Sequence, residues 1–96
     1  MEQIERIRQM ELLMERAAKA VMELSAALEN YQAVQEDIAE LERYYGSEAW
    51  KQDFADDEAG LLPADLKRGV LSEDGIWNLL EDVRELNDGL HELSDR

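Results

Sequence analysis

The residues best suited to chemistry in this sequence are carboxylates, four of which lie close together in mid-chain. Asp53, Asp56, Asp57 and Glu58 offer oxygen ligands of the kind that Ca²⁺ and Mg²⁺ prefer. The run lacks the alternating ligands and central glycine of a calcium loop, and consecutive residues of a helix point in different directions. The pattern favours a solvated acidic helix face and leaves a cation site as the alternative.

The single histidine, His91, limits the other kinds of catalysis. Asp88 and His91 have the i,i+3 spacing of a metal-binding pair, but a di-iron bundle needs such pairs from two helices. A serine nucleophile needs an adjacent base, no pattern places a serine beside His91, and the chain has no cysteine. We therefore expect no enzyme, and we assign no catalytic, cofactor-binding or metal-binding residue.

Negative charge is the most extreme global property of the chain. The sequence has 24 acidic and 10 basic residues and a net charge of -14. Residues 1–19 are balanced, so the whole net charge lies in residues 20–96. Nucleic acids and anionic membranes attract basic faces, so direct binding to either is not expected. An acidic surface serves solubility or, alternatively, imitates DNA toward a basic partner.

Four residues are candidates for an interaction surface. Lys67 and Arg68 are the only adjacent basic pair in the acidic region, and they either complement the end of a short helix or dock an acidic partner. Trp50 and Trp77 belong to a group of aromatic residues that forms either a small core or an exposed anchor.

These residues need helices to position them, and residues 1–45 have the pattern of a long helix or of two helices. Its apolar residues alternate by three and four, with a flanking row that makes the stripe broad enough to pack in a bundle. The alternating residues are Ile7, Met10, Met14, Ala17, Val21, Leu24, Leu28 and Tyr31. The pattern shifts at Asn30 to Gln35, so we predict a bend or break between Glu29 and Asp37, or a partner chain that covers the overhang.

Residues 46–71 form a connection with short helices. Gly46 is expected to end the long helix and Ser47 to cap a helix that Gly60 terminates. Leu61 and Leu62 are then expected to return to the core. Pro63 is expected to start a turn of helix that Gly69 closes.

The last helix is predicted over residues 72–94. Ser72 is expected to be its N-cap, followed by acidic residues that suit the helix dipole. Its apolar residues again repeat every three or four positions. They are Ile76, Leu79, Val83, Leu86, Leu90 and Leu93.

The segments YYGSEAW, DEAG and LPADLKRGVLSEDGIWNLLEDVREL, after a helix of this length, resemble a bacterial family of small acidic all-helical proteins catalogued only as a domain of unknown function. The resemblance covers essentially the whole chain. It implies an all-helical fold and a bacterial source, and it supplies no activity, ligand or catalytic residue.

The sequence thus predicts one all-α domain over residues 1–96, in which a long bent N-terminal helix packs antiparallel on a C-terminal helix. The N-terminal stripe is longer than the C-terminal one, so we expect self-association, most simply as a homodimer. The absence of cysteine and of a signal peptide or spanning segment predicts a cytoplasmic location. We expect a non-enzymatic interaction or adaptor module with an unidentified protein partner. The alternatives are a DNA mimic that regulates a nucleic-acid-binding protein and a carboxylate metal-dependent enzyme.

Overall fold

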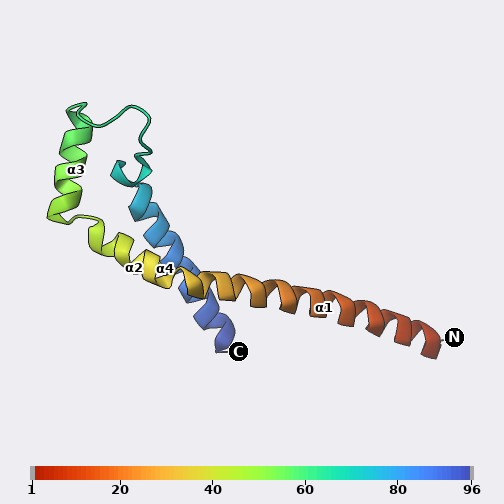
Figure 1. The fold of residues 1–96 in the computed structure, drawn as a ribbon. Coiled ribbons are helices and arrows are strands. Elements are labelled where there is room, and N and C mark those ends of the chain that lie inside the picture. The colour runs from red at the N-terminus through yellow and green to blue at the C-terminus, as the bar shows by residue number, and fades with distance from the viewer. Residues whose placement is uncertain (1, 96) are drawn as a thin grey trace. The chain divides into compact units, whose positions relative to one another are not determined.

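The computed structural model describes residues 2–95, which contain four α-helices, one 3₁₀-helix and no strand (Figure 1). The elements are α1 (Glu2–Ala33), α2 (Gln35–Tyr44), α3 (Glu48–Glu58), η1 (Gly69–Leu71) and α4 (Gly75–Ser94). The prediction of an all-α fold is confirmed. The contacts divide the chain into two units, Met1–Gln35 and Glu36–Arg96. The single domain and the antiparallel packing of the N-terminal and C-terminal helices stay predictions.

Helix α1 makes up almost all of the first unit. Its 32 residues correspond to a length of about 48 Å at 1.5 Å per residue. Every residue from 2 to 27 is exposed. The helix ends where Val34 forms a turn, and its amide donates to the Tyr31 carbonyl at 3.3 Å. The Gln35 side-chain amide donates to the same carbonyl at 2.9 Å. This interruption lies inside the segment 29–37 where the apolar pattern predicted a bend or break.

The turns on both sides of α3 follow the sequence signals. Gly46 and Gly60 have positive φ angles of 82° and 73°, which cost glycine little because it has no Cβ. The Ser47 hydroxyl accepts a hydrogen bond from the Trp50 amide at 3.2 Å and so caps the start of α3. At the other end, the amides of Gly60 and Leu61 donate to carbonyls of the last turn, the Schellman arrangement. The predicted bounds of this short helix are therefore confirmed.

The segment after α3 differs from the prediction. Pro63 does not start a helix: it forms a single turn closed by the Leu66 amide at 3.2 Å, and the short helix begins at Gly69, where we expected it to end. Leu61 is exposed rather than in the core, whereas Leu62 is half-buried. An isolated helical turn is costly to nucleate, so packing rather than the proline decides where it forms.

The last helix also starts at a different residue from the one predicted. Helix α4 begins at Gly75 with Asp74 as its N-cap residue, and Ser72 ends η1 instead. The Ser72 hydroxyl donates to the Gly69 carbonyl at 2.8 Å and accepts from the Gly75 amide at 3.0 Å. One serine thus joins the end of η1 to the start of α4, a local hydrogen-bonding role that serine shares with cap positions.

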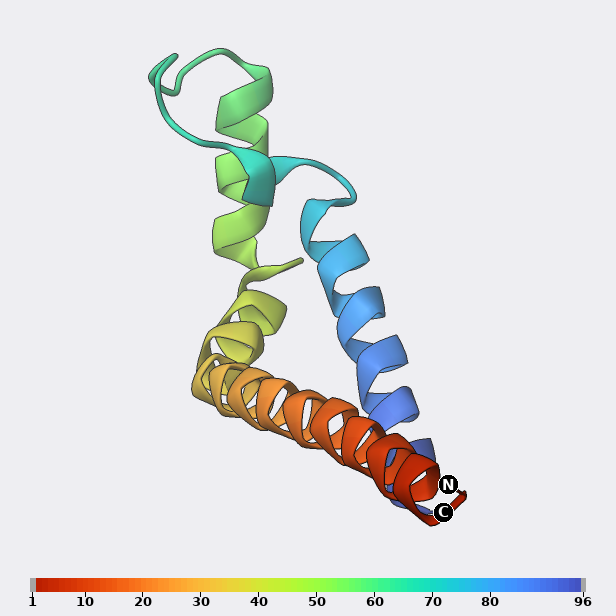
Figure 2. The same ribbon diagram turned by 90° about the vertical axis from the view of Figure 1, so that its right-hand side faces the viewer.

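The core of the second unit is small and centres on η1. Leu71 and Ile76 are the two buried residues among those described. Helix η1 contacts both α3 and α4 and lies between them (Figure 2). Because α3 and α4 meet the same short element, η1 determines how these two helices are spaced.

A close approach at Gly75 makes this junction intolerant of a side chain. A Cβ atom built on Gly75 would lie 2.4 Å from the Gly69 carbonyl oxygen and 2.6 Å from Ser72 Oγ. Gly89, in the interior of the same helix, has nothing within 4 Å of such an atom.

We predict that Gly75→Ala lowers the free energy of unfolding by about 1–3 kcal/mol, because the backbone of η1 has to move. The matched substitution Gly89→Ala should instead raise it by up to about 1 kcal/mol through helix propensity. Urea unfolding followed by circular dichroism measures both changes. Equal effects of the two substitutions would contradict the close packing at this junction.

Candidate functional site

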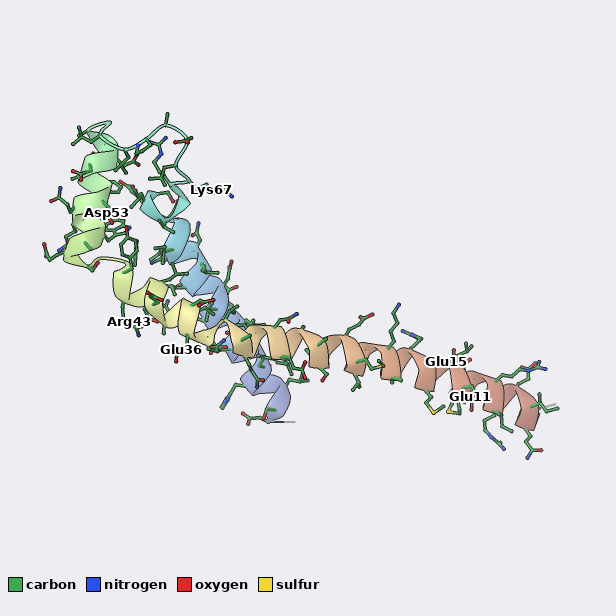
Figure 3. The ribbon with its side chains drawn as sticks, viewed as in Figure 1. Glu11, Glu15, Glu36, Arg43, Asp53 and Lys67 are labelled. Atoms are coloured by element: carbon green, nitrogen blue, oxygen red, sulfur yellow. The ribbon has the colours of Figure 1, made fainter. Side chains whose placement is uncertain are left out.

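The shortest polar contact between side chains of α2 and α3 joins Tyr44 to Asp53. The Tyr44 hydroxyl donates to Asp53 Oδ2 at 2.6 Å, and both residues are half-buried. Figure 3 labels Asp53 on α3. The turn that brings them together is closed by Ser47, whose hydroxyl donates to the Tyr44 carbonyl at 2.6 Å. The carboxylate therefore binds a phenol from the preceding helix.

This contact changes the acidity of the phenol. The hydrogen bond to Asp53 raises the pKa of Tyr44 to about 12, with smaller contributions from burial and from the negative charge of the carboxylate. A phenol with a raised pKa is a weaker acid and holds its proton at neutral pH. The hydrogen bond links α2 to α3.

Trp50 is the centre of an aromatic cluster. Its ring stacks on Phe54 at a centroid distance of 5.2 Å and meets Tyr45 edge-on at the same distance. The indole Nε1 donates to the Val70 carbonyl at 2.9 Å, and the Tyr45 hydroxyl donates to the Glu73 carbonyl at 3.0 Å. These contacts tie α3 to the segment that contains η1.

Arg68 and Lys67 have different surroundings. Arg68 Nη1 lies 2.7 Å from Asp57 Oδ1, and both side chains are partly buried. Lys67 is exposed. Trp77, the fourth candidate for an interaction surface, is half exposed on α4. The role of Trp50, Lys67, Arg68 and Trp77 in binding a partner stays a prediction.

The four clustered carboxylates do not converge. Asp53 accepts from Tyr44, Asp57 pairs with Arg68, and Asp56 accepts from the Gln52 side chain at 2.9 Å. Glu58 is exposed. Across residues 2–95, no three acidic, histidine or cysteine side chains are grouped so that they could hold a metal ion.

His91 also lies apart from any cluster. Its Nε2 atom is 4.0 Å from Asp95 Oδ2, one helical turn further along α4, and both side chains are exposed. Asp88, the partner that its spacing suggested, is likewise exposed. His91 and its two acidic neighbours therefore lie on the solvent-exposed surface.

Shallow recesses border η1 within the second unit: one of about 340 Å³, whose lining includes Tyr44, Asp53 and Lys67, and two larger ones. One, of about 490 Å³, is lined by Asp37, Glu40, Leu41, Tyr44 and Val70. The other, of about 380 Å³, shares Leu41 and Val70 with it and extends to Ile76 and Leu79 of α4. The exposed surface of both is mostly apolar, and the polar side chains of Asp37, Glu40 and Tyr44 line the first.

Helix α1 carries a row of exposed apolar side chains. We call this the α1 stripe: it consists of Ile7, Met10, Met14, Ala17, Val21, Leu24, Leu28 and Tyr31. Ile7, Met10, Met14, Val21 and Leu24 are each 46–67% exposed, and Leu28 and Tyr31 are half-buried. Contiguous apolar surface of this kind marks interaction sites in soluble proteins.

Comparison with known proteins places the chain in a family. Residues 7–92 match the family described as Domain of unknown function (DUF4298), and the chain belongs to it. No curated protein and no solved structure matches the chain. None of the helices within residues 2–95 is long and apolar enough to cross a membrane. The bacterial source and the cytoplasmic location stay predictions.

Sequence reasoning missed the Tyr44–Asp53 pair. It placed Asp53 in the acidic cluster and Tyr44 among the aromatic residues. The two lie nine positions apart across a turn, and no periodicity relates residues of different helices. The sequence signal for this contact is the turn at Gly46 and Ser47, because it separates the two helices that carry the two side chains.

The raised pKa of Tyr44 predicts a loss of stability at alkaline pH. The folded protein holds the phenol proton more tightly than the unfolded chain, whose tyrosines titrate near pH 10. The stabilisation is therefore complete below about pH 10 and is lost as the pH rises toward 12. Tyr44→Phe should remove the latest-titrating phenol from the absorbance titration at 295 nm and lower stability at pH 7 by about 1 kcal/mol.

Tyr45→Phe is the matched control, because it also removes one hydroxyl from the same turn. It should leave the late titration in place. A late titration that survives Tyr44→Phe would show that the hydrogen bond to Asp53 does not form in solution.

Proposed function

We propose that this protein is a non-enzymatic protein–protein interaction or adaptor module that associates with a second copy of itself through the α1 stripe. The observation that carries the proposal is the exposure of this stripe along a helix whose residues from 2 to 27 are all exposed. Burying one leucine, isoleucine or methionine side chain contributes roughly 1.5–3 kcal/mol. Covering several of them along one helix supplies enough free energy to offset the cost of association.

The sequence of α1 favours a second copy of this chain as the partner that covers the α1 stripe. The stripe repeats every three and four residues over four turns and more, the periodicity that lets two helices of the same sequence pack side by side. Residues 1–35 carry six acids and four bases and are nearly neutral, whereas residues 36–96 carry 18 acids and six bases. Two copies therefore meet with least repulsion along α1.

The adaptor role follows from the rest of the chain. If α1 joins two copies, the second unit of each is left to meet other proteins through its recesses near η1 and through Lys67, Arg68 and Trp77. The exposed apolar residues Val70 and Leu79 beside these recesses support this part of the proposal. Trp50, which lies in the aromatic cluster, is the remaining residue that we assign to this partner-binding surface.

A second candidate function, an acidic mimic of nucleic acid, is favoured by the net charge of −12 on residues 36–96. Binding of a basic protein to such a surface should weaken steeply between about 0.1 M and 1 M salt. Self-association through apolar side chains should persist over this range, because added salt screens the repulsion between two acidic chains. The salt dependence of each equilibrium, measured by sedimentation, separates the two functions.

The test of self-association compares two substitutions of the same type on α1. Met14→Glu places a charge in the stripe, whereas Met22→Glu places it off the stripe at a position that is 73% exposed. We expect the protein to sediment as a dimer, Met14→Glu to lower the association constant by at least about 100-fold, and Met22→Glu to leave it within a few-fold. Both side chains are exposed in the single chain, so neither substitution should unfold it.

A monomer mass for the unsubstituted protein over a wide concentration range would refute the proposal. Equal effects of Met14→Glu and Met22→Glu would show that the chains associate through another surface.

A further inference from the structure

We propose that the two α1 helices of the dimer run antiparallel, with the pair centred near Lys19. This inference rests on the self-association proposed above and specifies which residues meet. It places the half of α1 that contains all its basic residues against the half of the second copy that contains only acidic ones.

The first argument is the distribution of charge along α1. All four basic residues lie in the first part of the helix, at Arg6, Arg8, Arg16 and Lys19. Beyond Lys19, the charged residues of α1 are Glu23 and Glu29. The first part also contains Glu2, Glu5, Glu11 and Glu15 and is neutral overall. An antiparallel pair therefore sets a neutral part of one helix against the acidic part of the other, whereas a parallel pair sets the two acidic parts side by side.

The second argument is the charge that follows α1. Residues 36–96 have a net charge of −12 and are attached to the C-terminal end of the helix. In a parallel pair both attachment points lie at the same end. In an antiparallel pair they lie about 40 Å apart along the axis, several times the Debye length of about 8 Å at physiological salt. The antiparallel arrangement thus avoids the largest repulsion in the dimer.

The third argument is the volume of the side chains that meet. In an antiparallel pair Met14 lies opposite Leu24 of the second copy, and Ala17 lies opposite its Val21. Met10 lies opposite its Leu28. Each of these layers combines a larger with a smaller or similar residue, which keeps the helices at an even spacing. A parallel pair would stack Ala17 on Ala17 directly beside a layer of two methionines, and an even spacing would leave a void there.

One contact favours the opposite arrangement. In a parallel pair Arg6 would lie beside Glu11 of the second copy, because residues five apart face each other across such a seam. Both are exposed surface residues. The contact occurs twice by symmetry, but exposed ion pairs contribute little, so the two together do not offset the repulsion of the two acidic units.

The absence of cysteine makes the orientation testable in the full chain. A tagged Met14→Cys variant is mixed with an untagged Leu24→Cys variant, the subunits are allowed to exchange, and a mild oxidant is added. In the antiparallel pair these two positions are opposite, whereas two copies of position 14 lie about 15 Å apart along the axis. Cysteines with Cα atoms more than about 7 Å apart do not bridge, so the mixed disulfide should exceed either self-linked product roughly ten-fold or more.

The controls separate this inference from the proposal on which it rests. Ala26→Cys, on the opposite side of α1, should link to neither variant. A dimer in which each variant links to itself, or in which no mixed product forms, would overturn the antiparallel register while leaving self-association intact. A monomer by sedimentation before oxidation would overturn both. Circular dichroism of each variant checks that it is folded.

Discussion

The arrangement of the second unit depends on the contacts that the indole ring of Trp50 makes. It stacks on Phe54 of its own helix, meets Tyr45 from the preceding turn, and donates to the Val70 carbonyl in η1. One side chain thereby joins three successive parts of the chain. With α3 tied to η1 in this way, Leu71 and Ile76 become buried between the elements. A unit with so small a core relies on such directed contacts, because its hydrophobic burial alone is modest.

Apolar surface is distributed unevenly between the two units. The second unit buries the two residues that form its core, whereas α1 keeps a long stripe exposed even though its periodicity is that of a packed helix. In proteins, most of the stability of a helix comes from the apolar face that it buries rather than from intrinsic propensity. The same stripe that makes α1 amphipathic is therefore the surface through which we propose that it associates with a second copy.

The four clustered carboxylates of α3 do not point toward one common centre. Three of the four clustered carboxylates bind three different groups, the Tyr44 hydroxyl, the Gln52 amide and the Arg68 guanidinium. These contacts hold α3 to its neighbours or stabilise its own surface. Residues 36–96 are strongly negative and follow a nearly neutral helix. In the proposed dimer this asymmetry would influence how two copies approach each other more than any single ion pair.

The sequence by itself determined the features that depend on neighbouring residues. Periodicity specified the helices, Gly46, Ser47 and Gly60 specified the ends of α3, and the shift in the apolar pattern located the break near Val34. Only the tertiary structure decided the contacts between elements. The Tyr44–Asp53 hydrogen bond, the packing of Trp50 against η1 and the start of α4 at Gly75 each depend on groups brought together by folding. Ser72 shows the reason: its hydroxyl bonds Gly69 and Gly75 at once, and a choice among several local partners is settled by packing rather than by residue type.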